Sequence, residues 1–422
     1  MSTKNTQSFE TYESEVRSYC RNFPAVFTSA KGPFLYDEDG KAYIDFFCGA
    51  GALNYGHNPD AIKEKLIEYL QSDGVMHALD MYTAPKREFI EFYEEKILKP
   101  RGLDYKIQFV GPTGTNAVEA ALKLARKVKK RTNIFAMMGG FHGMTLGSIA
   151  LTTDAASRAG AGVPLYNVTH IPAPYMFPGL DTIEYMETLL TDDHSGVEKP
   201  AAIILETTQA DGGIYPFDTQ WLKAVRALCD RHDILMIVDD VQVGCARTGW
   251  FFSFERAGIQ PDIITQSKSI GGYGMPFAVV LLKPELDVWE PGEHNGTFRG
   301  YQLSMIAAKA GLEIMINEHV EEKVREKGEI VSQYMESIRA LAPGKIAARG
   351  LGLVWGVDFW AYDHDGKMSK KVLDEAFRRG LIVERVGRGN TVIKVMPELL
   401  IDEETLRRGL DILTEAIRAA IG

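Results

Sequence analysis

Four short apolar segments in the middle of the chain place the strongest constraint on its fold. Each is an unbroken apolar run of strand length, which is typical of a strand covered on both faces of its sheet. Between the first two, residues 219–233 carry apolar side chains at helical spacing. A strand, a helix and another strand in succession predict an α/β protein with a mostly parallel central sheet. The segments are "AAIILE" (201–206), "ILMIVDD" (234–240), "DIITQS" (262–267) and "FAVVLL" (277–282).

The last part of the chain follows a different pattern, which predicts a second, smaller domain. A long charged helix is expected at 319–341, and strands are expected within 349–359 and 390–397. We expect this α+β domain to be completed by the N-terminal segment. The predicted boundaries are residues 1–75 for the N-terminal segment, 76–312 for the large domain and 313–422 for the C-terminal small domain.

Composition and charge exclude several classes of protein. The net charge is −10, and the densest basic run, "RKVKKR" (126–131), is more typical of a solvated helix end than of a nucleic-acid surface. Residues 1–20 are polar and no apolar run is long enough to cross a bilayer, so a cytoplasmic protein is expected. The four cysteines have no C-x-x-C spacing, so neither a disulfide framework nor a metal site is indicated.

Polar side chains stand at the ends of three of the predicted strands. They are Glu206, Asp239 and Lys268, and a parallel sheet binds its ligands beyond the carboxyl ends of its strands. Earlier in the chain, "TGTNA" (113–117) opens a helix, where free N–H groups favour a phosphate. A lysine can form an imine with an aldehyde, and an aspartate can hold a pyridinium proton. One cofactor, pyridoxal phosphate, uses all three kinds of group.

Taken alone, each of these groups also has an ordinary structural explanation. The segment "TGTNA" fits a helix cap, and Asp239 fits a cap for the element that follows it. The tripeptide "FHG" (141–143) fits core packing, and a lysine such as Lys268 is usually solvated. Independent structural roles would leave the order of these groups along the chain unexplained. That order therefore favours a single binding site.

Six successive motifs resemble those of a known family. Over almost its whole length the chain is similar to the class III pyridoxal-phosphate aminotransferases, the ornithine aminotransferase-like group of fold type I. The resemblance implies a large domain with a mostly parallel sheet, a smaller α+β domain, pyridoxal 5'-phosphate as cofactor, and a homodimer or a dimer of dimers. The motifs are "GPTGTNAVEAALKLAR", "GGFHGMTLGS", "IILETTQADGG", "IVDDVQVGCARTG", "TQSKSIGGYGMP" and "HNGTFRG".

This resemblance implies roles for particular residues. Lys268 matches the lysine that binds the cofactor covalently, and Asp239 matches the aspartate that pairs with the pyridine nitrogen, so both are predicted to be catalytic. Gly114 and Thr115 match the groups that donate to the phosphate. The other expected cofactor contacts are Phe141 and Val241 on the two faces of the ring, His142 beside Phe141, Gln242 near the phenolic oxygen, Glu206 at its strand end, and Thr297, which would reach the phosphate of the neighbouring subunit.

The substrate pocket departs from the family pattern. Members that act on ornithine or aminobutyrate carry an arginine at the position of Met144. The family's paired glutamate and arginine match Asp211 and Lys394, and a lysine cannot reproduce the bidentate fork of arginine. Asp211, Lys394 and Arg17 are the predicted substrate-binding residues. Surface charges, or salt bridges between subunits in the case of Arg17, are the alternatives.

A finer resemblance concerns the substrate. The segments "VRSYCRNFPAVF", "GALNYGHNP" and "ELDVWEPGEHNGTFRG" are similar to the diaminobutyrate–2-oxoglutarate aminotransferase branch, which serves ectoine synthesis. The predicted reaction converts glutamate and L-aspartate 4-semialdehyde to 2-oxoglutarate and L-2,4-diaminobutyrate. The alternatives are an ω-aminotransferase that uses ornithine, a short ω-amino acid or taurine, and a pyridoxal-phosphate lyase or isomerase on the same fold.

Overall fold

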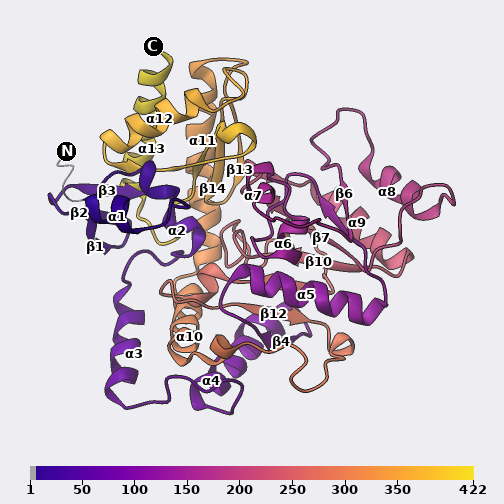
Figure 1. Ribbon diagram of the computed structural model, residues 1–422. Coiled ribbons are helices and arrows are strands. Elements are labelled where there is room, and N and C mark those ends of the chain that lie inside the picture. Colours follow the sequence, from indigo (N-terminus) through magenta and orange to yellow (C-terminus); the bar gives the residue numbers. More distant parts are fainter. Residues whose placement is uncertain (1–5) are drawn as a thin grey trace.

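The computed structural model describes residues 6–422, which contain the expected central sheet (Figure 1). Its strand order is β4-β12-β11-β10-β7-β5-β6. The strands from β11 to β6 are parallel, whereas β12 is antiparallel to both of its neighbours. The predicted α/β class is therefore confirmed. The strands are β4 (Lys106–Phe109), β5 (Ile134–Met137), β6 (Val168–Ile171), β7 (Ala202–Leu205), β10 (Leu235–Asp239), β11 (Ile263–Gln266) and β12 (Val279–Leu282).

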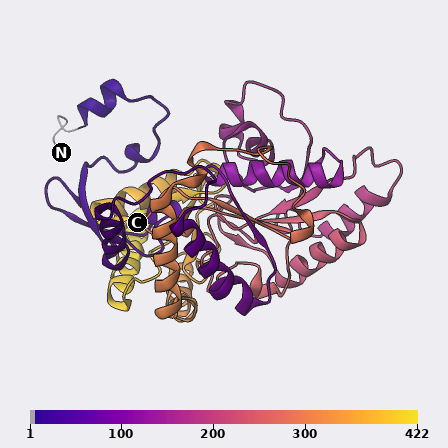
Figure 2. The ribbon, with the colours of Figure 1, turned by 90° about the horizontal axis from the view of Figure 1, so that it is seen from below.

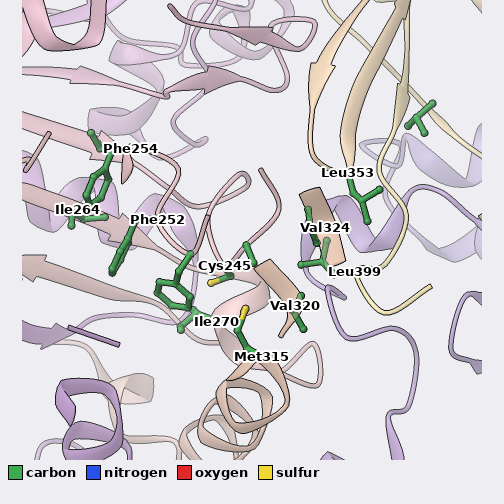
Figure 3. Close-up of a cluster of buried hydrophobic side chains, with 14 of the residues drawn as sticks. Cys245, Phe252, Phe254, Ile264, Ile270, Met315, Val320, Val324, Leu353 and Leu399 are labelled. Atoms are coloured by element: carbon green, nitrogen blue, oxygen red, sulfur yellow. The ribbon is translucent and has the colours of Figure 1, made fainter. Parts of the chain in front are cut away.

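Two amphipathic helices pack against this sheet where the sequence predicts them. They are α5 (Gly114–Lys129) and α9 (Thr219–Arg231), and each buries one face. The Asp218 carboxylate caps α9 by accepting hydrogen bonds from the N–H groups of Gln220 and Trp221. A continuous apolar core packs against one face of the sheet, and Figure 3 shows part of it around Phe252, Ile264 and Met315. This core fixes the strand ends relative to one another.

Two smaller four-stranded sheets accompany the central sheet, and the first of them joins the N-terminal and C-terminal parts of the chain. The first has the order β1-β2-β3-β15, with β15 parallel to β3, and the second has the order β13-β14-β17-β16. In Figure 1 the indigo N-terminal strands accordingly lie beside the yellow C-terminal helices. This pairing supports a small domain completed by the N-terminal segment, although the exact boundaries stay a prediction. The strands are β1 (Phe27–Lys31), β2 (Phe34–Asp37), β3 (Ala42–Asp45), β13 (Ala347–Leu351), β14 (Val354–Asp358), β15 (Leu381–Ile382), β16 (Glu384–Val386) and β17 (Val392–Val395).

The predicted strand region 349–359 contains a hairpin, because β13 and β14 pair antiparallel around Gly352. Gly352 has a φ of +54°, which permits the tight turn. None of the helices within residues 6–422 combines the length and apolar character needed to cross a membrane. The remaining α-helices and β-strands are α1 (Gln7–Tyr12), α2 (Cys48–Gly51), α3 (Asp60–Gln71), α4 (Ala84–Tyr93), α6 (Leu146–Leu151), α7 (Ala155–Ala159), α8 (Thr182–Thr191), β8 (Thr208–Gln209), β9 (Tyr215–Pro216), α10 (Gln302–Asn317), α11 (Val320–Leu341), α12 (Lys367–Arg378) and α13 (Glu403–Ile421).

Removing bulk from the central strand should destabilise the whole molecule. Ile237 is fully buried in β10, between β7 and β11, so Ile237→Ala should lower the free energy of unfolding by about 2–5 kcal/mol. Ile67→Ala is the control, because that side chain is exposed on α3, and it should cost well under about 1 kcal/mol. Urea denaturation of both variants measures the difference. Equal losses would contradict this account of the core.

Candidate active site

One cavity lies at the carboxyl ends of the parallel strands. Glu206 follows β7, Asp239 ends β10, and Lys268 lies two residues beyond β11. All three side chains line this cavity, whose volume is about 150 Å³. The sequence-based expectation that they lie close together therefore agrees with their placement in the structure. The lining residues are Gly114, Thr115, Phe141, His142, Gly143, Glu206, Asp211, Asp239, Val241, Gln242 and Lys268.

Lys268 is held in an unusual backbone conformation. Its φ is +54°, in the left-handed region that residues other than glycine seldom adopt, and it begins a 3₁₀ turn, Lys268–Gly271. The preceding Ser267 hydroxyl donates to the carbonyl of Phe277 on the neighbouring segment, which fixes this turn. Burial lowers the pKa of the Lys268 ammonium, although the nearby Asp211 carboxylate acts in the opposite direction. The environment thus shifts the amine toward its neutral form, which is the nucleophilic form.

Asp239 faces the cavity in a buried hydrogen-bond network. One carboxylate oxygen lies 2.7 Å from Nδ1 of His142, and the other accepts hydrogen bonds from the Thr265 hydroxyl and the Val241 N–H, each at 3.2 Å. Burial acts to lower the pKa of His142, but the hydrogen bond and charge of Asp239 together raise it. Nε2 of His142 is buried and has no hydrogen-bond partner within residues 6–422. The network therefore fixes the orientation of the Asp239 carboxylate.

Glu206 organises the loop that follows β5. Its two oxygens accept hydrogen bonds from the N–H groups of Phe141 (3.0 Å) and Ala210 (3.1 Å). Burial raises the pKa of this carboxyl from 4.5 to about 7. Glu206 thus links the segment that carries Phe141 to the segment that leads to Asp211.

The start of α5 forms another wall of the cavity. Its first N–H groups have no partner within the helix, and Gly114 and Thr115 line the cavity. A Cβ at Gly114 would lie 2.9 Å from Cγ1 of Val241, and one at Gly143 would lie 2.5 Å from Oγ1 of Thr115. Only glycine therefore lets the helix start, the 139–145 loop and Val241 approach this closely. The cavity beside this helix start fits a cofactor that carries a phosphate, because free N–H groups at a helix start favour an anion.

A buried ionic cluster adjoins the cavity. Nζ of Lys394 lies 2.6 Å from Oε2 of Glu384, 3.5 Å from Oδ1 of Asp211 and 3.2 Å from Oε1 of Gln242. Burial acts to lower the pKa of Lys394, but the charges of Glu384 and Asp211 raise it above its ordinary value. Lys394 is therefore cationic. It is fully buried and does not line the cavity, so contact between its ammonium and a substrate carboxylate stays a prediction.

Three other residues singled out in the sequence lie away from the cavity wall. Thr297 is exposed, and its carbonyl contacts His77. Arg17 is held by Glu13 and Glu15 in the N-terminal arm, which Figure 2 shows extending from the body of the molecule. Met144 is exposed just beyond the lining residue Gly143. The roles of Thr297 and Arg17 therefore stay predictions.

Sequence reasoning missed Glu384 and Gly143. Glu384 on β16 stands directly opposite Lys394 on β17, so its pairing depends on the register of two strands joined by an irregular loop. The only local signal in the sequence was Glu384 itself, a carboxylate within the largely apolar segment "LIVERV" (381–386). Gly143 could have been suspected from its place in "FHG", since glycine is the usual residue where the backbone makes a close approach.

Known proteins similar to this chain point to one family. The family model Aminotransferase class-III matches residues 16–417, which confirms the resemblance seen in the motifs. Relatives named diaminobutyrate–2-oxoglutarate transaminase include that of Nocardia farcinica, 52% identical over 419 residues (99% of this chain, 95% of the relative). Those of Halalkalibacterium halodurans and Streptomyces coelicolor are 51% identical over 423 residues (100% and 98%) and 53% identical over 415 residues (97% and 97%).

Solved structures share the fold. An S-selective transaminase from Arthrobacter sp. has a TM-score of 0.88 at 22% identity, covering 99% of this chain and 97% of that one. An ornithine aminotransferase from Toxoplasma gondii has a TM-score of 0.84 at 23% identity, covering 99% and 94%. The latter is described with PLP at its active site. The predicted fold type is confirmed by these likenesses.

The raised pKa of Glu206 predicts how stability changes with pH in the cofactor-free protein. Its folded-state pKa of about 7 exceeds 4.5, so its contribution to stability is complete below about pH 4.5 and is lost as the pH rises to about 7. Asp240 and Glu398 act in the same direction. Glu206→Gln should therefore reduce the fall in unfolding free energy between pH 5 and pH 7.5, as measured by urea denaturation. The exposed control Asp193→Asn should keep the wild-type slope, and an unchanged slope in Glu206→Gln would contradict the assignment.

Proposed function

The chain belongs to the class-III aminotransferases. We propose that it is an enzyme that transfers an amino group between L-2,4-diaminobutyrate and 2-oxoglutarate, and that the reaction takes place in this cavity. The enzyme depends on pyridoxal 5'-phosphate, as the family does. The observation that carries the proposal is the convergence of Lys268, Asp239 and the start of α5 on one cavity. The substrates are supported by full-length relatives of about half-identical sequence that are named for this reaction.

The residues around the cavity fit pyridoxal phosphate. The start of α5 would hold the phosphate, the Asp239 carboxylate would meet the pyridine nitrogen, and the Lys268 amine would bind the aldehyde carbon. The close approach of Val241 to Gly114 leaves no room for a side chain at position 114. We propose Gly114, Thr115, Phe141, His142, Glu206, Asp239, Val241, Gln242 and Lys268 as cofactor contacts.

When bound, pyridoxal phosphate carries the amino group and draws electrons from the substrate carbon beside it. Lys268 supplies the base for this reaction, because its environment favours the neutral amine, which can take a proton from that carbon. The same amine returns a proton in the opposite half of the reaction. Asp239, oriented by His142, stabilises positive charge at the ring nitrogen. Since one cavity serves both substrate pairs in turn, the kinetics are ping-pong.

We also propose that two copies of the chain assemble around this site, as a homodimer or a dimer of dimers. Residues 76–82 pack beside 297–301, where His77 contacts the Thr297 carbonyl and the Phe298 ring. The two segments present an exposed apolar surface. A second copy would cover that surface and would place Thr297 near the partner's phosphate site. The exposed side chains are Met76, Leu79, Met81, Tyr82 and Phe298. A cytoplasmic location and a place in ectoine synthesis remain predictions.

Half-reactions test the proposed substrates directly. The holoenzyme is mixed with a single amine and no acceptor, and conversion of the cofactor to its amine form is followed by absorbance. L-2,4-Diaminobutyrate and glutamate should both convert the cofactor, with ornithine, 4-aminobutyrate and taurine at least about tenfold slower in kcat/KM. A preference for ornithine or taurine would replace the proposal by one of those activities. Product formed over many turnovers without an acceptor, in excess of the cofactor present, would indicate a lyase or isomerase.

The assignment of Lys268 predicts the loss of covalent cofactor. After borohydride reduction, wild-type protein should retain the cofactor on the peptide that contains Lys268, whereas Lys268→Ala should not. Turnover in the variant should fall by at least about a thousandfold, because both the covalent attachment and the base are lost. Lys65→Ala, an exposed lysine on α3, is the control and should behave as wild type. Trapping of cofactor on the Lys268→Ala protein would refute the assignment.

Replacing Asp239 with Asn should slow transamination without preventing the cofactor from binding. The shape is kept but the anionic partner of the ring nitrogen is removed, so transamination should fall by at least about a hundredfold with cofactor still bound. Asp240→Asn is a demanding control, because Asp240 is equally buried but its side chain faces the Ser253 N–H and does not line the cavity. Steady-state rates and cofactor content are measured for both. A larger rate loss in Asp240→Asn would transfer the role to that residue.

A further inference from the structure

The Asp211 carboxylate is held at the cavity by its backbone. The Ala210 N–H donates to Glu206, the Asp211 carbonyl accepts a hydrogen bond from the Gly387 N–H at 2.9 Å, and the Gly213 carbonyl accepts one from Arg349 at 2.6 Å. Three successive anchors thus fix the segment 210–213. The side chain lines the cavity and is partly exposed there. The carboxylate itself is left available, because its only ion-pair neighbour within residues 6–422 is Lys394, at 3.5 Å.

The charges around Asp211 do not balance. Lys394 lies 2.6 Å from Glu384 and 3.5 Å from Asp211, so its single positive charge is engaged mainly by Glu384. Within the cluster of Asp211, Glu384 and Lys394, two carboxylates and one ammonium leave a net charge of −1. Lys268 is the other cationic group near Asp211, and burial lowers its pKa. Arg349, which anchors Gly213, is itself paired with Asp358 at 3.0 Å. Arg388 lies farther out, exposed to solvent over the Tyr175 ring, where water and salt screen it.

The surplus negative charge lies close to where the amino group is transferred. Asp211 and Lys268 line the same cavity. The nearest exposed side chain beyond Gly143 is the uncharged Met144, so no cation at that position offsets the charge. A half-buried carboxylate without a strong partner favours a cationic group that can hydrogen-bond to it. In L-2,4-diaminobutyrate one methylene separates the two amine-bearing carbons, so both amines fit in one cavity.

We propose that Asp211 selects the diamino acid by receiving its second ammonium, the one that is not transferred. This inference rests on the proposed function and names the group that the site recognises. Glu384 acts through Lys394: by engaging the lysine it keeps Asp211 free to bind substrate, and it is a positioning residue. Glutamate has no second ammonium, so its distal carboxylate lies away from Asp211. The Asp211 charge is therefore needed in only one half of the reaction.

Three donors separate the groups of the substrate. 4-Aminobutyrate is diaminobutyrate without the second ammonium, and 1,3-diaminopropane is diaminobutyrate without the carboxylate. In Asp211→Asn, kcat/KM of the half-reaction should fall by about 10- to 100-fold for diaminobutyrate and for 1,3-diaminopropane. It should change less than about threefold for 4-aminobutyrate and glutamate. The loss for diaminobutyrate in Asp211→Asn should appear mainly as a higher KM. In the wild type, kcat/KM for diaminobutyrate should fall as salt is raised, so the difference between wild type and variant should become smaller.

Two further variants keep the test decisive. In Glu384→Gln, Lys394 has only Asp211 as a carboxylate partner, so the Asp211 charge is cancelled and the same selective loss is expected. Asp193→Asn, which changes an exposed carboxylate on the α8–β7 loop, should change no donor. Cofactor absorbance and thermal midpoint confirm that each variant is folded and loaded.

Equal losses for all four donors in Asp211→Asn would overturn the inference, because a structural role does not distinguish amines. Unchanged use of diaminobutyrate in that variant would overturn it as well. If the wild type does not accept diaminobutyrate at all, the proposed function fails instead. The two failures are therefore distinguishable within one set of measurements.

Discussion

The site depends on keeping a lysine amine in a desolvated cavity without pairing it to a carboxylate. Among the described residues Lys268 has no ion pair, and burial lowers its pKa. An adjacent salt bridge would hold the amine protonated and unreactive. Two of the three carboxylates that line the cavity are instead engaged elsewhere: Asp239 with His142 and Glu206 with two backbone N–H groups. Lys268 stands on a left-handed turn and lines the same cavity as the start of α5.

Much of this arrangement could be predicted from the sequence, because its signals are local. Continuous apolar runs predicted β7, β10, β11 and β12 within two residues of their ends. Parallel pairing then implied that Glu206 and Asp239 share one edge of the sheet, since the carboxyl ends of parallel strands meet there. The family motifs added the particular role of each residue, which no periodicity contains.

Other parts could not be predicted, because they depend on contacts between distant segments. The pairing of Glu384 with Lys394 requires the register of β16 and β17, and a slip of one residue would separate the two side chains. The hydrogen bond between His142 and Asp239 joins residues that are 97 positions apart. Two sequence features, the lysine at 394 and the aspartate at 211, suggested an altered carboxylate site. Only the geometry indicates that the lysine is buried against Glu384 while the aspartate faces the cavity.

One cavity must therefore accept a diamino acid and a dicarboxylic amino acid in alternate half-reactions. The surplus charge at Asp211 accounts for the first of these, and it predicts the orientation of the substrate: the C4 amine at Lys268 and the C2 ammonium at Asp211. Relatives of about half-identical sequence carry the name of the same reaction. The claim specific to this structure is the orientation in which the diamino acid binds.

Position-specific deuterium labelling tests that claim most directly. The holoenzyme is mixed in single turnover with L-2,4-diaminobutyrate deuterated at C4 or at C2, and the rate of cofactor conversion is recorded. Because Lys268 takes the proton from the carbon that bears the transferred amine, the C4 label should slow conversion by a primary isotope effect and the C2 label should leave it unchanged. A primary effect from the C2 label, with none from C4, would place the α-amine at Lys268 and contradict the account.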